Sequence, residues 1–268
     1  MTPARSSWRR LPAAVLTAGV AALSAVPVAV LPAALPAAAT MRTPTAGPVE
    51  TSCVGAHRYA AEAGAQLLRL HRLDLRPAGH TEPPVTGIGL GTARSVLVAE
   101  SPINSAAAAQ VLDGHVSEQA APAALTRQLY QQAPPDNRAP RRSTVAAQQA
   151  GPLSIGAAKL ASHARWLAPM ACGAGWGEVT AAQTGLAGAT LLTGTGGRAL
   201  ISVPAGLTSL SSTALDRRGA NVHTVARAAA TMPDIRLLAG AVRLRVLRPP
   251  RLQTSIAASP GSAEVRYA

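Results

Sequence analysis

The sequence has 268 residues, of which 48% are hydrophobic and 2% aromatic, with no Phe and a formal net charge of +13. A chain of this length can bury a sizeable core in one or two domains, and that core must be built from Val, Leu, Ile and Ala rather than from aromatic rings. Of the 25 basic residues only Lys159 is a lysine, so arginine is abundant throughout and no single Arg is evidence for a binding site.

Residues 1–39 have the pattern of a signal peptide. Arg5, Arg9 and Arg10 form a positive start, the run from Leu11 to Leu35 has no charged residue, and Ala37 to Ala39 provide an A-x-A cleavage site. The prolines in this run would break a membrane-spanning helix, although an uncleaved anchor remains the alternative. We therefore expect a secreted, extracellular protein, either free or associated with the cell envelope.

The charge balance after cleavage predicts the class of partner. Removing residues 1–39 leaves 22 basic and 12 acidic residues, a net charge of +10. Such a chain favours anionic partners, namely an acidic cell-wall polymer, lipid headgroups or nucleic acid. Export makes an anionic cell-wall polymer or the membrane surface the expected partner.

The two cysteines, Cys53 and Cys172, are expected to form one disulfide. An even number of cysteines in an exported chain is typical of a bridge, and closing a loop of this length stabilises by roughly 4 to 5 kcal/mol on the chain-entropy model. A metal or catalytic thiol is the alternative, but neither cysteine has a second ligand at useful spacing.

The N-terminal half of the mature chain mixes extended and helical patterns. Residues 40–56 form a Pro- and Thr-rich flexible lead, and residues 57–132 form a mixed segment of strands and short helices. Strands are expected from Tyr59 to Pro77 and from Val85 to Glu100. For the first segment a helix with Leu67, Leu70 and Leu73 on one face is the alternative. Short helices are expected within residues 101–114 and from Pro122 to Gln132.

Residues 133–143, rich in Pro and Arg, are expected to be a linker to a β-rich domain over residues 144–268. Extended segments recur there at short spacing and are separated by glycines, as in an antiparallel meander. The predicted fold is mainly β, an antiparallel meander or sandwich with one or two short helices in the N-terminal part. A β-solenoid is the alternative, although no repeat of fixed period supports it.

The clearest strand pattern lies between Ile235 and Leu252. Val242, Leu244 and Val246 alternate with arginines as in a half-buried strand, and Ile235 to Leu238 is its expected partner through a turn at Ala239 and Gly240. This stretch contains a stripe of arginines with no acidic residue among them: Arg236, Arg243, Arg245, Arg248 and Arg251. The stripe is either a contact for an anionic polymer or an ordinary solvated sheet face.

No sequence motif for catalysis or cofactor binding is present. The chain lacks a G-x-S-x-G nucleophile elbow, an H-x-x-x-H metal pair and a phosphate loop ending in Gly-Lys. The group of residues that comes nearest to a metal site is His71, Asp74, His80 and Glu82. We favour a solvated loop over a metal site for these residues. Nucleic-acid binding is not expected, because no aromatic residue accompanies the arginine stripe.

The whole-chain pattern resembles uncharacterised exported proteins of high-GC actinobacteria. The resemblance rests on the signal peptide, a Cys near the mature start, the segment AEAGAQLLRLHRLDL and an Ala-, Gly- and Thr-rich β region. The resemblance is one of composition and carries no catalytic motif. From the sequence we expect a structural or interaction protein of the cell envelope, with no enzymatic site and no cofactor. The alternatives are an exported hydrolase whose site forms only in three dimensions, and a small-ligand carrier.

Overall fold

The computed structural model describes residues 59–74, 85–114, 123–193, 198–219, 221–232, 234–257 and 263–268. These residues belong to one compact unit that extends from Glu50 to Ala268. The expected signal peptide (1–39) and flexible lead (40–56) lie outside the described residues. Strands dominate the described part, which confirms the prediction of a mainly β, antiparallel fold.

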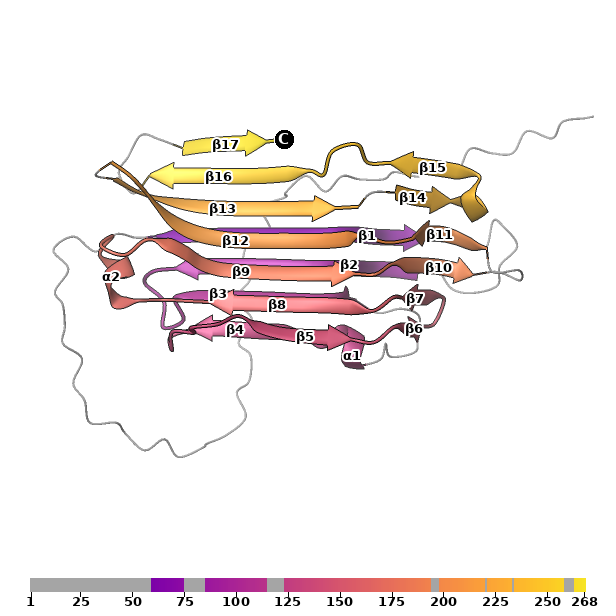
Figure 1. Cartoon of the computed structure of the whole chain (residues 1–268), viewed down its shortest axis with the longest axis horizontal. Coiled ribbons are helices and arrows are strands. Elements are labelled where there is room, and N and C mark those ends of the chain that lie inside the picture. Colours follow the sequence, from indigo (N-terminus) through magenta and orange to yellow (C-terminus); the bar gives the residue numbers. More distant parts are fainter. Residues whose placement is uncertain are drawn as a thin grey trace, which may run out of the picture. The chain divides into compact units, whose positions relative to one another are not determined.

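The strands form three antiparallel sheets (Figure 1). The four-stranded sheet has the order β1 (Ala60–Leu73), β2 (Val85–Val98), β3 (Ser105–Asp113), β4 (Leu129–Ala133). The seven-stranded sheet has the order β17 (Ala263–Tyr267), β16 (Arg251–Ala257), β13 (Asn221–Thr231), β12 (Leu207–Arg218), β9 (Gly177–Leu186), β8 (Ala158–Ala164), β5 (Arg141–Val145). The six-stranded sheet has the order β15 (Val242–Arg245), β14 (Asp234–Leu237), β11 (Ala199–Val203), β10 (Ala189–Thr193), β7 (Leu153–Ile155), β6 (Gln148–Ala150).

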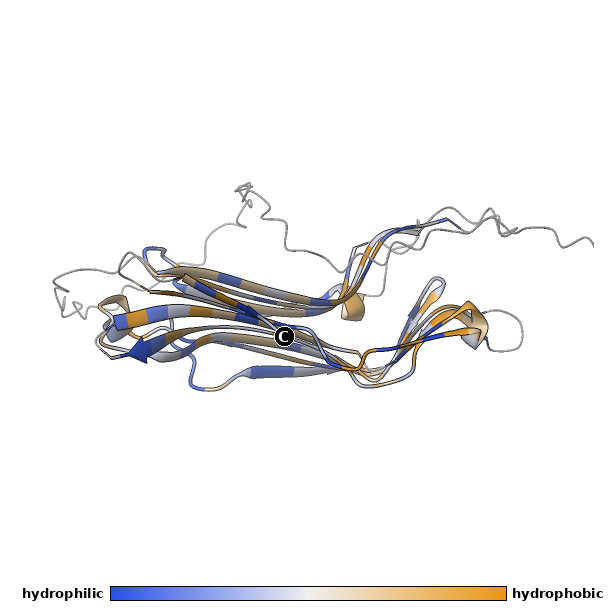
Figure 2. Ribbon diagram, turned by 90° about the horizontal axis from the view of Figure 1, so that it is seen from above, coloured by the Kyte–Doolittle hydropathy of each residue, from blue (hydrophilic) through white to orange (hydrophobic). Residues whose placement is uncertain are grey.

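The seven- and six-stranded sheets continue into each other across a crease. The strands lie end to end in Figure 1, and backbone hydrogen bonds bridge the crease from Gly156 N to Gly188 O (2.9 Å) and from Ala187 N to Ala157 O (2.9 Å). A Cβ atom on Gly188 would lie 2.8 Å from Pro204 O, so only glycine fits there without a shift of the backbone. The two sheets therefore form one bent layer, and the four-stranded sheet is the second layer of a sandwich (Figure 2).

Small side chains fill the space between the four- and seven-stranded sheets. Ala93, Ala107 and Ala182 form one fully buried cluster, and hydroxyl groups bond from one layer to the other. Ser95 Oγ donates to Ser211 O (3.1 Å), and Thr184 Oγ1 donates to Thr92 O (2.8 Å). Because these side chains are short, the two backbones approach closely and the alternation of Ala, Ser and Thr fits the gap.

Larger aliphatic side chains fill the space beyond the crease. Leu153, Ile155 and Leu191 of the six-stranded sheet pack with Ile88 and Leu90 of β2. The face of the bent layer that points toward the four-stranded sheet is called the inner face here, and the opposite face is called the outer face. Ile235 and Leu237 pack against this core, so β14 turns these two side chains to the inner face.

The helix predictions for the N-terminal part were largely wrong. Residues 101–114 contain strand β3, because its alternate residues from Ser105 to Val111 point into the narrow gap between the layers. The stretch from Pro122 to Gln132 contains one helical turn, α1 (Ala123–Thr126), followed by β4. A second short helix, α2 (Ala168–Ala171), lies outside the N-terminal part. Both α-helices of the described residues are single turns, too short to cross a membrane.

The expected linker residues connect two strands of the same unit. Ala133 ends β4 in the four-stranded sheet, and β5 begins at Arg141 in the seven-stranded sheet. Asn137 ties this connection to the body, since its side-chain Nδ2 donates to Gln132 O (2.8 Å) and Ala164 O (2.7 Å). The chain therefore passes from one layer of the sandwich to the other at this point.

Candidate functional site

The hairpin that the sequence predicts between Ile235 and Val246 is confirmed. Strands β14 and β15 pair antiparallel and are joined by the turn η2 (Leu238–Gly240), in which Ala239 (φ 58°) and Gly240 (φ 91°) have left-handed backbone conformations. Because side chains alternate along each strand, Ile235 and Leu237 lie on the inner face together with their cross-strand partners Leu244 and Val242. The arginines of both strands consequently lie on the outer face.

Three of the five predicted arginines lie next to one another on this hairpin. Arg236 of β14 lies directly opposite Arg243 of β15, and Arg245 lies opposite Asp234. All three arginines are exposed. We call Arg236, Arg243 and Arg245 the arginine face.

The other two predicted arginines lie beside this group rather than within it. Arg248 is exposed in the connection from β15 to β16, which crosses the crease between the two strands (Figure 1). Arg251 is the first residue of β16 and pairs with Ala229 of β13. Its neighbour Leu252 is in register with Ala228 of β13 and Ser211 of β12, and Ser211 points to the inner face. Leu252 therefore points inward as well, and because side chains alternate along a strand, Arg251 lies on the outer face.

Cross-strand neighbours of like charge repel each other, so the arginine face needs a counter-charge. Residues directly opposite in an antiparallel pair have Cβ atoms about 5 Å apart, and like charges at that distance are destabilising. Asp234 provides one counter-charge by accepting a hydrogen bond from Arg243. Arg236, Arg243, Arg245 and Asp234 together carry a formal charge of +2, which an anionic ligand would neutralise.

A row of hydroxyl groups continues from the arginine face across the outer face of the six-stranded sheet. Arg236 pairs with Ser202 of β11, Ser202 with Thr190 of β10, and Thr190 with Ser154 of β7. Each hydroxyl residue lies between two inward-pointing apolar residues of its strand, so it points outward. The sequence analysis missed this row, because strand order joins residues that are far apart in the chain.

The pKa of Asp234 reports how closely the arginines surround it. The hydrogen bond from Arg243 lowers this pKa most, partial desolvation opposes the shift, and the charges of Arg243, Arg245 and Arg236 lower it further. Conversely, the same hydrogen bond raises the pKa of Arg243. The three guanidinium groups therefore act on a single point of the outer face.

The prediction of a half-buried β15 was only partly correct. Val242 and Leu244 point to the inner face, yet they are 40% and 43% exposed. The reason is that the bent layer is wider than the four-stranded sheet, so the edge strand β15 extends beyond the covering layer. Strand β15 is thus exposed on both faces, whereas β14 packs its inner face against the core; Figure 1 shows β15 at the edge of its sheet.

The histidines that would serve an enzymatic site are held by other contacts. His163 lies 3.1 Å from Glu178 Oε1 through Nδ1 and 3.0 Å from Asn137 O through Nε2. His223 Nδ1 lies 3.5 Å from Ser255 Oγ, which is long for a hydrogen bond. The described contacts of His163 are thus a carboxylate and a backbone carbonyl rather than a serine.

One open hollow of about 610 Å³ lies near His163, where β4 passes to β5. Asn137 belongs both to this hollow and to the contacts of His163, and Arg141 donates to Tyr130 O (3.1 Å) across its wall. Its lining is Tyr130, Gln131, Gln132, Pro135, Asn137 and Arg141. Burial raises the pKa of Tyr130. Because its lining contains one arginine and the arginine face has three, the hollow is the weaker candidate for an anionic ligand.

The remaining sequence candidates lie on strands or outside the described residues. His71 and Asp74 are described, and Asp74 pairs with Arg72 at 3.4 Å, whereas His80 and Glu82 lie outside the described residues. Within the described ranges, no three His, Cys, Asp or Glu side chains are placed to hold a metal ion.

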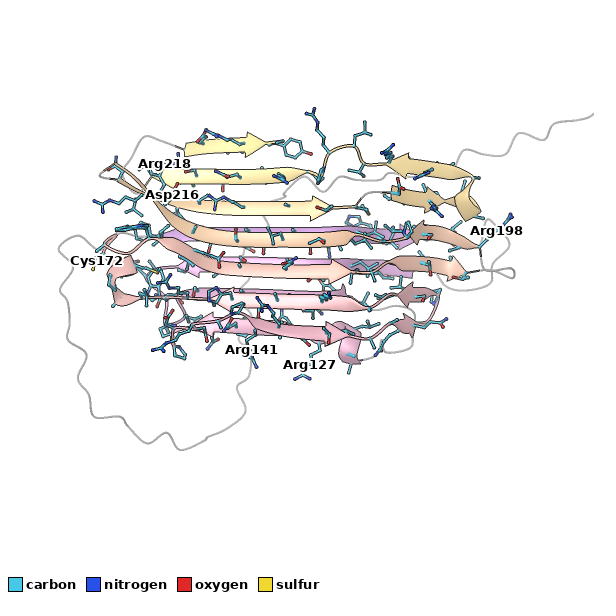
Figure 3. All side chains as sticks on the ribbon, viewed as in Figure 1. Arg127, Arg141, Cys172, Arg198, Asp216 and Arg218 are labelled. Atoms are coloured by element: carbon cyan, nitrogen blue, oxygen red, sulfur yellow. The ribbon has the colours of Figure 1, made fainter. Side chains whose placement is uncertain are left out.

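The expected disulfide is described at one end only. Cys172 follows α2 and is not a free thiol; Figure 3 shows it beside this helix. Cys53 lies outside the described residues, so the pairing of the two cysteines stays a prediction.

Comparisons with known proteins give no family assignment. No protein-family model, no curated protein and no solved structure matches the chain.

Proposed function

We propose that the protein is an exported binding protein of the cell envelope whose arginine face contacts an anionic polymer. The observation that carries the proposal is the direct opposition of Arg236 and Arg243, with Arg245 beside them and Asp234 as their counter-charge. Guanidinium groups bind phosphate and carboxylate oxygens through paired N–H donors, which makes them suited to such a ligand.

The form of the site favours a long, flexible ligand. Arg243 and Arg245 are two residues apart on one strand, which separates their Cα atoms by about 7 Å. The row of Ser202, Thr190 and Ser154 continues from Arg236 across three more strands and supplies hydroxyl groups for a polar chain. The ligand is therefore expected to lie across the strands, with its anionic groups at the hairpin.

Charge and predicted export point to the same partner class. Exposed charge pairs are screened by salt, so contact with a polymer of many anionic groups is expected to weaken as ionic strength rises. Each basic residue at an anionic surface contributes about 1 kcal/mol. Because each contribution is small, several arginines must contact the polymer together to bind it stably.

Binding to poly(glycerol phosphate), with neutral dextran as a comparison, tests this proposal. Replacing both Arg236 and Arg243 by Ser (R236S/R243S) is expected to weaken binding roughly 30-fold, which corresponds to about 2 kcal/mol. The matched control R127S/R142S removes the same charge at the opposite edge, near Arg127 in Figure 3, and is expected to bind like the unmodified protein. Equal losses in both variants would reduce the effect to net charge and refute the site.

A further inference from the structure

Strand β17 forms one edge of the seven-stranded sheet. In the described part of the chain it pairs with β16 alone, in the register Leu252 with Tyr267, Thr254 with Val265 and Ile256 with Ala263. A strand of this kind presents a row of backbone N–H and C=O groups that another strand can use. The sequence of β17 is Ala-Glu-Val-Arg-Tyr, without a proline that would block such pairing.

The hydrogen bonds of β17 show which backbone groups point outward. Arg251 and Ala268 exchange two bonds, with N to O distances of 2.9 and 3.0 Å, so this is a hydrogen-bonded pair. Such pairs alternate along an antiparallel ladder, so Arg266 and Glu264 also direct their backbone groups toward β16. The N–H and C=O groups of Ala263, Val265 and Tyr267 therefore point away from the sheet.

The side chains of β17 divide into an apolar and a charged face. Val265 is 69% exposed and Tyr267 is 71% exposed, and both lie on the inner face, as does Ile256 of β16, which is 54% exposed. Glu264 and Arg266 lie on the outer face, where they form an ion pair with each other, and Arg218 Nη1 lies 3.6 Å from Glu264 Oε2. The edge thus combines uncovered apolar groups with one acid and one base, two residues apart.

We infer that β17 pairs antiparallel with β17 of a second copy of this chain, about a two-fold axis at Val265. In this register Val265 meets its own counterpart, and Ala263 meets Tyr267 of the second copy. These three positions are the ones whose backbone groups point outward, so each pair exchanges two hydrogen bonds. Glu264 of each copy then lies directly opposite Arg266 of the other.

Charge selects this register over its neighbours. A two-fold axis at Glu264 would place Glu264 opposite itself, and an axis at Arg266 would place Arg266 opposite itself. Like charges directly opposite in a sheet are destabilising, whereas opposite charges stabilise. All three registers keep the apolar side chains of both copies on one face, but the Val265 register alone among them gives two Glu–Arg pairs.

The dimer joins the two bent layers edge to edge. The two-fold axis of such a pair is perpendicular to the sheet, so the outer faces of both copies point to the same side. Both arginine faces would then be presented together, which raises the avidity for one long polymer. The dimer itself requires no polymer, so its test is independent of the proposed function.

Sedimentation equilibrium of the purified exported chain, without polymer, tests the inference. The protein is expected to approach twice its monomer mass as its concentration rises to roughly 100 µM. Glu264→Arg and Arg266→Glu each place like charges opposite and are expected to weaken dimerisation roughly tenfold or more. The double exchange E264R/R266E restores both opposite-charge pairs and is expected to restore the dimer.

Two further variants separate pairing from folding. Val265→Pro removes an outward N–H that the monomer does not use, so it is expected to abolish the dimer while circular dichroism stays unchanged. Glu62→Arg makes the same charge reversal on the edge strand β1 and is expected to leave the dimer intact. A monomer at all concentrations, a dimer in V265P, or no recovery in E264R/R266E would overturn the inference.

Discussion

Asp234 sets the charge of the arginine face at the level of single residues. It accepts the hydrogen bond of Arg243 and lies opposite Arg245, and these arginines lower the pKa of its carboxyl group. Asp234 thus stays ionised to a lower pH than an ordinary aspartate. Its contribution to stability is present above the ordinary aspartate pKa and is lost as the pH falls through the lowered value.

Replacing Asp234 by Asn is expected to increase the affinity for poly(glycerol phosphate) roughly fivefold, because Arg243 becomes available to the polymer. Acidification through the lowered pKa of Asp234 should have the same effect in the unmodified protein and a smaller one in D234N. Titrations across this pH range measure both. Asp113→Asn is the control, since it removes a carboxylate that pairs with Arg94 at 3.5 Å on the other layer. An equal gain in D113N would contradict a local effect.

Gly91 is a position at which the fold requires glycine. It has φ of +61° in the middle of β2, and a Cβ atom there would lie 2.2 Å from Leu67 Cδ1. Gly91→Ala is expected to lower the free energy of unfolding by roughly 2 to 4 kcal/mol, from backbone strain and crowding together. Gly64→Ala, at an open position of the neighbouring β1, is expected to leave stability unchanged. Urea denaturation of both variants checks this, and equal stabilities would show that the bend tolerates a side chain.

Strand β3 shows at the level of elements why small residues line the gap between the layers. Ala107 is 1% exposed and contacts Ala93 and Ala182, whereas its neighbour Ala106 points to the other side of the strand. Ala107→Leu is expected to cost roughly 3 kcal/mol, because the two layers would have to move apart. Ala106→Leu is the matched control and should cost little. Thermal unfolding that ranks the two variants equally would contradict the close approach of the layers.

The elements also show how far the sequence alone could lead. The hairpin of β14 and β15 was predicted correctly, because Val242 and Leu244 alternate with arginines and Gly240 permits the turn. Strand β3 was not predicted, because a run of alanines favours a helix in isolation. In the folded protein the narrow gap between the layers favours the extended form instead. The arginine stripe was recognisable, but the hydroxyl row beside it depends on strand register and order. Those are set by long-range pairing that local pattern does not encode.

At the scale of the whole molecule, the disulfide is expected to tie the N-terminal lead to the sandwich at Cys172. Denatured, unreduced protein is expected to show no reactive thiol, and reduced protein two. Cys53→Ser together with Cys172→Ser should lower the free energy of unfolding by roughly 4 to 5 kcal/mol on the chain-entropy model. Two reactive thiols before reduction would show that the bridge does not form.

The two layers differ in width, and this difference organises the surfaces of the molecule. The four-stranded sheet covers only part of the bent layer, so β15, β16 and β17 extend beyond it (Figure 1). The proposed polymer contact lies on the outer face of β14 and β15, beside this extension, and the proposed dimer contact lies along the edge formed by β17. A ligand bound there would meet several strands at once, so its binding site belongs to the layer as a whole.

Arginine footprinting tests the proposed contact most directly. The protein is treated with an arginine-selective dicarbonyl reagent, with and without poly(glycerol phosphate), and modified sites are quantified by mass spectrometry. We expect the polymer to protect Arg236, Arg243 and Arg245, while Arg127 and Arg142 at the opposite edge react as before. Uniform protection of all five arginines, or none at the arginine face, would contradict the account.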